Sequence, residues 1–96
     1  MYGLIGQFTA HPGKRDELIG CMTNDVGPIP GCISFIVAVD PKDADTIWVT
    51  EVWDSEASHK ASLQMPAIAA SIKIAIPLIA AFGQQIVTEP VSVVPA

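Results

Sequence analysis

The stretch "CISFIVAVDPKDADTIWVTEVW", residues 32–53, decides the fold. Its two ends carry β-branched and aromatic side chains in loose alternation, which is typical of β-strands. The "DPKDAD" segment at 40–45 consists largely of turn-forming residues. The stretch therefore predicts two antiparallel strands, over 32–39 and 46–53, that a short polar loop joins.

Before this hairpin, the pattern predicts a strand, a helix and a break. "YGLIGQFTA" at 2–10 has the composition of a strand, and a His-Pro-Gly turn ends it. An apolar stripe over 14–25 predicts an amphipathic helix. The "GPIPG" sequence at 27–31 then separates this helix from the hairpin.

After the hairpin, a helix-capping serine, two prolines and a glycine indicate the limits of a second helical region. Ser55 is placed to cap its first turn. Pro66 suits the first turn of a continuing helical segment and predicts a bend there. Pro77 is expected to end or kink that segment, and Gly83 to close it.

A last strand, "QQIVTEPVSVV", is expected over 84–94, where Pro90 and the following Pro95 restrict it to a sheet edge or to an arm along another chain. The order strand, helix, strand, strand, helix, strand predicts an α+β fold of the ferredoxin-like βαββαβ type. Its antiparallel sheet would carry two helices on one face. We expect one domain over residues 1–96.

Both faces of the predicted hairpin are largely apolar. In the first strand, strict alternation places Ile33, Phe35, Val37 and Val39 on one face, and Cys32, Ile36 and Ala38 on the other. In the second strand, it places Ile47, Val49 and Trp53 opposite Trp48 and Val52. Helices cover only one face, and soluble monomers avoid large exposed apolar patches. We therefore expect a homodimer through the second sheet face, with the C-terminal strand as an exchanged arm.

Charge and composition exclude several classes of partner. The net charge is −5 and the five Lys and Arg residues are scattered, so we expect no nucleic acid and no anionic membrane surface. The apolar segment 67–82 is interrupted by Lys73 and Pro77 and predicts a buried helix rather than a membrane span. Cys21 and Cys32 form no metal-binding pattern, which fits a reducing, cytoplasmic environment. The N-terminus has no signal-peptide pattern.

The joint "EVWDSEASHK" at 51–60 holds the candidate catalytic residues. Glu51 and Trp53 share one face of a strand, and His59 follows early in the next helix. An imidazole exchanges protons near neutral pH, and a Trp can stack on a flat ligand. Each also has a structural alternative: Trp53 as a core aromatic, Glu51 as a partner of Lys60 or His59, and His59 as a surface residue.

Four further side chains are candidate substrate-binding residues: Phe8, Phe35, Val49 and Met65. Each is equally compatible with a place in the core. They would also line any cavity left between helices and sheet, and small residues such as Ala69, Ala70 and Ala75 would leave room for one. The two histidines, at 11 and 59, are too far apart to predict a metal site.

Three stretches together resemble a known family: "PGCISF" at 30–35, "DPKDAD" at 40–45 and "EVWDSEASH" at 51–59. They resemble the antibiotic biosynthesis monooxygenases, of the dimeric α+β barrel superfamily. The resemblance implies a homodimer that oxidises a quinol or anthrone-type aromatic substrate with O2 and needs no metal or flavin cofactor. It places Trp53 as a pocket wall and His59 where one branch has a hydrogen-bonding aromatic residue.

This chain departs from the family pattern at several positions. Val49 stands where the polyketide-oxidising branch has Asn, and Ser62 and Ala67 stand where quinol-type members carry His. A haem-degrading branch uses further residues that are absent here, so haem is disfavoured. These departures keep a second class open, a ligand-binding barrel without catalysis, and a weaker third, an isomerase or decyclase on the same fold.

Overall fold

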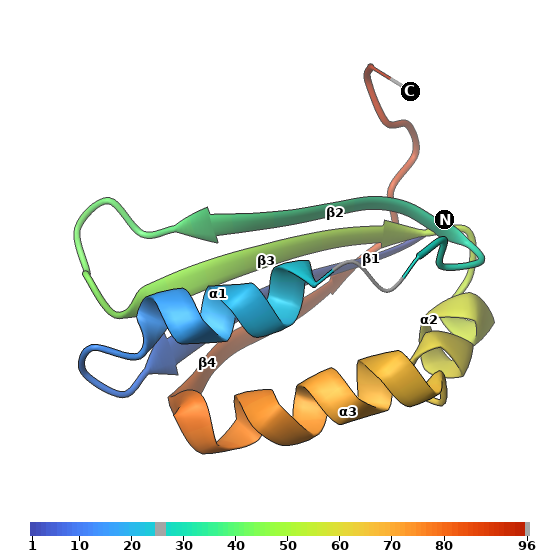
Figure 1. Cartoon of the computed structure of the whole chain (residues 1–96). Helices are drawn as coiled ribbons and strands as arrows, with labels where there is room; N and C mark the ends of the chain where they lie inside the picture. The colour runs from blue at the N-terminus through green and yellow to red at the C-terminus, as the bar shows by residue number, and fades with distance from the viewer. Residues whose placement is uncertain (25–26, 96) are drawn as a thin grey trace.

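The computed structural model of the chain describes residues 1–24 and 27–95, and it confirms the predicted α+β, ferredoxin-like fold. Its elements are β1 (Tyr2–Ala10), α1 (Arg15–Thr23), β2 (Cys32–Val39), β3 (Thr46–Trp53), α2 (Glu56–Ser62), α3 (Pro66–Ala75), η1 (Ile76–Leu78) and β4 (Ile79–Thr88). The four strands form one antiparallel sheet in the order β2-β3-β1-β4. Helix α1 lies against one face of this sheet, α3 lies beside α1 on the same side but farther from the strands, and α2 lies at one end of the sheet (Figure 1).

The β2–β3 hairpin has the predicted bounds because its loop is fastened at both ends. One carboxylate oxygen of Asp40 accepts hydrogen bonds from the backbone N–H groups of Lys42 and Asp43, at 2.8 and 3.2 Å. The other oxygen accepts a bond of 3.0 Å from Trp48 Nε1. These bonds hold the pKa of the Asp40 carboxyl below its usual range, the Trp48 bond most of all.

The hydrophobic core lies under the end of the sheet that α1 covers. Leu18, the one buried residue of α1, is fully buried, as is Ile47 of β3, and both cluster with Ala10 and Val49. Burying a Leu or Ile side chain contributes roughly 1.5–3 kcal/mol each. This cluster therefore fixes α1 onto the sheet and sets the height of the helix layer above it.

The positions of α2 and α3 agree with the predicted cap at Ser55 and the predicted bend at Pro66. The Ser55 hydroxyl accepts a hydrogen bond from the Ser58 backbone N–H at 3.2 Å and caps α2, as expected. Pro66 is in the first turn of α3 and confirms the predicted bend, because the helical segments 56–62 and 66–78 meet at 75°. Met65 lies between them as the N-cap of α3. The bend moves α3 back across the sheet.

Strict alternation mispredicted the start of β2. Cys32 pairs with Trp53, Ser34 pairs with Val52, and the register shifts between them, so Ile33 has no Cα partner. A bulge of this kind lets two residues oppose one. Cys32 therefore stands beside Trp53 on the helix-facing side, not on the opposite face with Ile36 as the alternation predicted.

The last helix and strand are also displaced from their predicted bounds. The α-helix ends at Ala75 and the 3-10 turn that contains Pro77 follows, because proline removes a backbone donor. Strand β4 then begins at Ile79 rather than at 84, and Gly83 lies inside it instead of closing the helix. The strand ends before Pro90 and is an edge strand, as the prolines predicted. The predicted end of the first helix, Asp25, lies outside the described residues.

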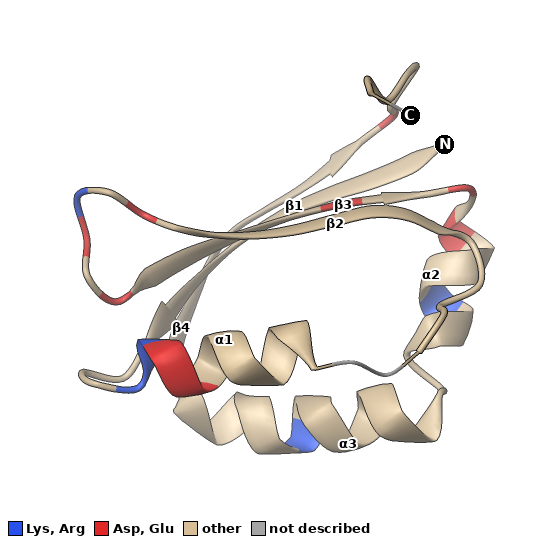
Figure 2. Cartoon of the chain, turned by 45° about the horizontal axis from the view of Figure 1, so that its top comes forward, with Lys and Arg blue, Asp and Glu red and all other residues tan. Residues whose placement is uncertain are grey.

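The face of the sheet away from the helices is partly apolar and partly open, with the polar residues Gln7, Ser34 and Thr50 between its apolar side chains. Ile36 and Ile86 are 55% and 42% exposed on it, and Val52 and Trp48 are half-buried there. Figure 2 shows that most charged residues lie in the loops and near element ends, with one basic position within α3 and one acidic position within β3, and that β2 carries none. Beyond β4 the chain extends away from the body, with Val91 and Val94 almost fully exposed (Figure 1).

Among the described residues, no single helix is long and apolar enough to cross a membrane. One pair, α2 with α3 and η1, passes that test together by length and composition, but the pair is bent by 75°.

Candidate functional site

A cavity of about 720 Å³ lies between the helix-facing side of the sheet and the three α-helices. Its walls are mostly apolar and come from the four strands, the three α-helices, η1 and residues between these elements. Several wall residues, among them Phe35 and Phe82, keep 44% and 62% of their surface exposed, so the cavity opens to solvent. This volume is within the range of small-molecule binding sites.

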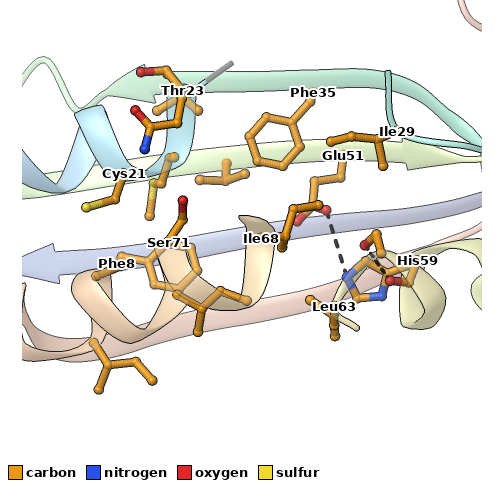
Figure 3. Close-up of a pocket in the computed structure, with 18 of the residues that line it drawn as sticks. Phe8, Cys21, Thr23, Ile29, Phe35, Glu51, His59, Leu63, Ile68 and Ser71 are labelled. Carbon is orange, nitrogen blue, oxygen red and sulfur yellow. Dashed lines mark hydrogen bonds and ion pairs between the residues drawn. The ribbon is translucent and has the colours of Figure 1, made fainter. Parts of the chain in front are cut away.

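One polar cluster stands on this apolar wall, and it contains the three predicted catalytic residues. Figure 3 shows two of them, Glu51 and His59. The Trp53 indole Nε1 donates a hydrogen bond of 3.0 Å to Glu51 Oε1. The same oxygen lies 3.9 Å from His59 Nε2, which is an ion pair when His59 is protonated. Of the two partners that the sequence suggested for Glu51, the structure places His59 beside it. The hydrogen bond from Trp53 to Glu51 was not predicted from the sequence.

Two aromatic rings flank the imidazole. The Trp53 ring meets the His59 ring edge to face, with centroids 5.3 Å apart, and the Tyr2 ring lies 5.8 Å away on a tilted plane. Trp53 is only 2% exposed and also lines the cavity. It is therefore both a core aromatic residue and part of the cavity wall. The rings fix the orientation of His59 because both arise from paired positions of neighbouring strands.

The strand–helix joint that carries His59 is held by close packing around Gly31. The backbone N–H of Asp54 donates to the Gly31 carbonyl at 2.9 Å. Gly31 has a φ of +83°, and a Cβ there would lie 2.5 Å from Ser58. Glycine is the residue that adopts this conformation readily and leaves room for α2.

The predicted substrate-binding residues are mostly brought together. Phe8, Phe35 and Val49 line the cavity with the catalytic candidates. Met65 is not among the described residues that line it, because its place is in the bend before α3. Of the small residues expected to leave room, Ala75 lines the cavity, whereas Ala69 and Ala70 are exposed.

The sequence profile of the antibiotic biosynthesis monooxygenases matches residues 1–73. The chain belongs to the antibiotic biosynthesis monooxygenase family. Membership supports a monooxygenase-like role in general.

Solved structures agree with this assignment. A protein from Chloroflexus aurantiacus J-10-fl, provisionally assigned to the same monooxygenases, is 52% identical to this chain. The match covers 95% of this chain and 93% of that one, with a TM-score of 0.91.

More distant structures show the fold alone. Provisionally assigned members from Nitrosomonas europaea and Deinococcus radiodurans are 13% and 17% identical, with TM-scores of 0.83 and 0.75. The matches cover 96% and 100% of this chain, and 100% and 98% of those proteins, respectively. A search of curated proteins found no significant match.

Several cavity residues of this family member were not predicted as site residues. The last turn of α1 contributes Cys21, Met22 and Thr23, and α3 contributes Ile68 and Ser71. The apolar stripe over 14–25 predicted an inward-facing side for α1, but only the contact between α1 and α3 shows that both helices close the same cavity. No local signal distinguishes a cavity-lining helix turn from one that is packed shut.

Two of the residues at which this chain departs from the family pattern, Ser62 and Val49, have structural roles. Ser62 is buried and its hydroxyl donates a hydrogen bond of 2.6 Å to the His59 carbonyl, so it holds the last turn of α2. Val49 belongs to the core cluster and to the cavity wall at once.

Thiol and metal chemistry find little support among the described residues. Burial raises the pKa of the Cys32 thiol, and the nearby Glu51 carboxylate raises it further, which outweighs the opposing effect of a backbone hydrogen bond with Ser34. A raised pKa disfavours the thiolate, which is the nucleophilic form of cysteine. Over residues 1–24 and 27–95, no three His, Cys, Asp or Glu side chains gather as a metal site.

Proposed function

We propose that this protein is a cofactor-independent monooxygenase that oxidises a small quinol or anthrone-type aromatic substrate with O2. The observation that carries the proposal is a single carboxylate–imidazole pair, Glu51 with His59, on the wall of an otherwise largely apolar cavity of about 720 Å³. Flat aromatic molecules favour such a cavity, and a proton acceptor is what their activation requires.

The chemistry needs only a base, an apolar pocket and oxygen. For an anthrone, His59 removes a proton from the methylene carbon, and the resulting carbanion gives electrons to O2. A carbon–oxygen bond forms, and the peroxide takes the proton back from His59 to give a hydroperoxide. The remaining C–H bond at that carbon then breaks together with the O–O bond, so that the carbonyl forms and its proton and the OH group leave as water. One anthrone and one O2 thus yield one anthraquinone and one water. The substrate itself is the reductant.

We assign complementary roles to the three residues. The 3.9 Å between Glu51 Oε1 and His59 Nε2 is too long for a hydrogen bond, and a substrate oxygen or a water between them could contact both. Glu51 stabilises the imidazolium that forms when His59 accepts the proton. Trp53 holds Glu51 in place through its indole N–H and contributes a flat wall to the cavity.

Oxygen uptake tests the proposal. Purified protein would be supplied with anthrones and naphthoquinols, with chelator present and no flavin, and compared with a Trp53→Ala His59→Ala double variant. Enzyme-dependent uptake that vanishes in the double variant supports the proposal. Uptake equal in both proteins, after subtraction of spontaneous oxidation, contradicts it.

A ligand-binding barrel without catalysis is the second candidate. Its support is that the Trp53 N–H, the Glu51 carboxylate and the buried Ser62 hydroxyl already satisfy one another or the backbone, as a structural network does. In that case an aromatic ligand would bind tightly and be recovered unchanged after incubation in air.

We further propose a homodimer through the open face of the sheet, with the segment after β4 lying along the partner. The support is the apolar surface around Ile36 and Ile86 and the nearly full exposure of Val91 and Val94. Light scattering should show a dimer for the wild type and a monomer for Ile36→Glu. The matched control Ile74→Glu, at a position 62% exposed on α3, should remain dimeric. A dimer that survives Ile36→Glu would contradict this assignment of the interface.

A further inference from the structure

The cavity has a second polar feature on the α3 wall, apart from the Glu51–His59 pair. Ile68, Ser71, Ile72 and Ala75 all line the cavity, and their spacing places them on one face of α3. Ser71 carries the only polar side chain on this face. Figure 3 shows its hydroxyl directed away from the α3 backbone and into the cavity.

The hydroxyl groups that line the cavity differ in what they bond. Thr23 Oγ1 donates to the Ile19 carbonyl at 2.9 Å, and Ser62 Oγ donates to the His59 carbonyl at 2.6 Å. Over the described part of the chain, the Ser71 hydroxyl makes no hydrogen bond. A helical serine commonly bonds the carbonyl four residues before it, and Ser71 leaves that option unused.

A half-buried hydroxyl on an apolar wall loses free energy unless a partner reaches it. Asn24, another polar residue at the cavity, is exposed to solvent. Ser71 stands instead among isoleucines, on the helix opposite the strand that carries Glu51. An aromatic molecule that fills the cavity would displace the water next to this hydroxyl and would have to replace its hydrogen bond.

We propose that Ser71 is a specificity residue that binds a second polar group of the substrate. This inference rests on the proposed function and narrows its substrate class. The substrate is an aromatic ring system with a hydroxyl or carbonyl on the ring remote from the group that His59 deprotonates. Molecules without that group leave the Ser71 hydroxyl unpaired and bind less well.

Anaerobic calorimetry with two probes separates binding from oxidation. The probes are 1,4-dihydroxynaphthalene and 1,4,6-trihydroxynaphthalene, which differ by one hydroxyl on the second ring. The wild type should bind the trihydroxy probe roughly three- to tenfold more tightly, as one neutral hydrogen bond allows. Ser71→Ala should abolish this preference, and Ser71→Thr, which keeps the hydroxyl, should retain it. The matched control Ser34→Ala, on the opposite face of the sheet, should leave it unchanged.

The outcomes distinguish this inference from the proposed function. Equal affinity of the wild type for the two probes, or a preference that persists in Ser71→Ala, overturns the role of Ser71. A preference that depends on Ser71, without enzyme-dependent oxygen uptake on either probe, supports the role of Ser71 and overturns the monooxygenase proposal. No binding of either probe overturns both.

Discussion

Replacing Glu51 by Gln removes the charge of the candidate pair while preserving its shape. Gln keeps an oxygen that can accept the 3.0 Å bond from Trp53 Nε1, so the joint remains held. What is lost is the Coulomb attraction between the carboxylate and a protonated His59 at 3.9 Å. Because that attraction exists only once His59 has accepted a proton, its loss should slow turnover rather than weaken substrate binding.

The distance gives the size of the effect. Coulomb's law over 3.9 Å corresponds to about 1 kcal/mol at the dielectric constant of water and about 4 kcal/mol at an effective value of 20. The two side chains are 19% and 18% exposed, which places the pair between these limits. A loss near 2 kcal/mol corresponds to about a thirtyfold decrease in kcat.

The assay is the initial rate of oxygen uptake with a saturating anthrone, corrected for spontaneous oxidation. The matched control is Asp40→Asn, because Asp40 also accepts an indole N–H at 3.0 Å but lies in the β2–β3 loop. Its kcat should equal that of the wild type. A kcat for Glu51→Gln within twofold of the wild type would refute the role assigned to Glu51, and so would an equal loss in Asp40→Asn.

Three further predictions concern stability and pH. Gly31→Ala should destabilise the protein by roughly 2–4 kcal/mol in urea unfolding, since its Cβ would lie 2.5 Å from Ser58 at a φ of +83°; an unchanged midpoint would contradict this. Leu18→Ala should cost about 3 kcal/mol in the same assay, because the side chain is fully buried under α1, and a loss below about 1 kcal/mol would contradict its place in the core. The folded-state pKa of Asp40 is lowered, so its contribution to stability is present above the unfolded pKa of about 3.9 and is lost as pH falls through the folded value. The Asp40→Asn variant should therefore lose less stability than the wild type as pH falls from about 5 to about 2. Unfolding followed by circular dichroism measures this, and an equal loss of stability in the two proteins would contradict the account.

Local sequence patterns correctly predicted the elements whose ends are set by turn-forming residues. The hairpin over 32–53 has its predicted bounds because turn formers meet strand formers abruptly at Asp40 and again at Thr46. Strand β4 was misplaced because "IAAF" at 79–82 continues the apolar composition of α3. Pairing of β4 with β1, a long-range contact, decides in favour of the strand.

The candidate site was predictable only in the part that is local in sequence. Glu51, Trp53 and His59 are close along the chain, and strand and helix periods indicate which way they point. The far wall, with Cys21 on α1 and Ser71 on α3, depends on how the two helices meet over the sheet. Hydrophobic periodicity predicts that such residues face inward, but it does not predict whether they meet another side chain or a cavity.

Labelled oxygen tests the central claim most directly. Chelator-treated protein would be supplied with an anthrone under 18O2, and the quinone product analysed by mass spectrometry against the His59→Ala variant. The proposed mechanism predicts one labelled oxygen atom in each enzymatic product molecule, formed at a rate that falls by roughly a hundredfold or more without His59. Product that carries no label, or labelled product formed equally fast by His59→Ala, would contradict the account.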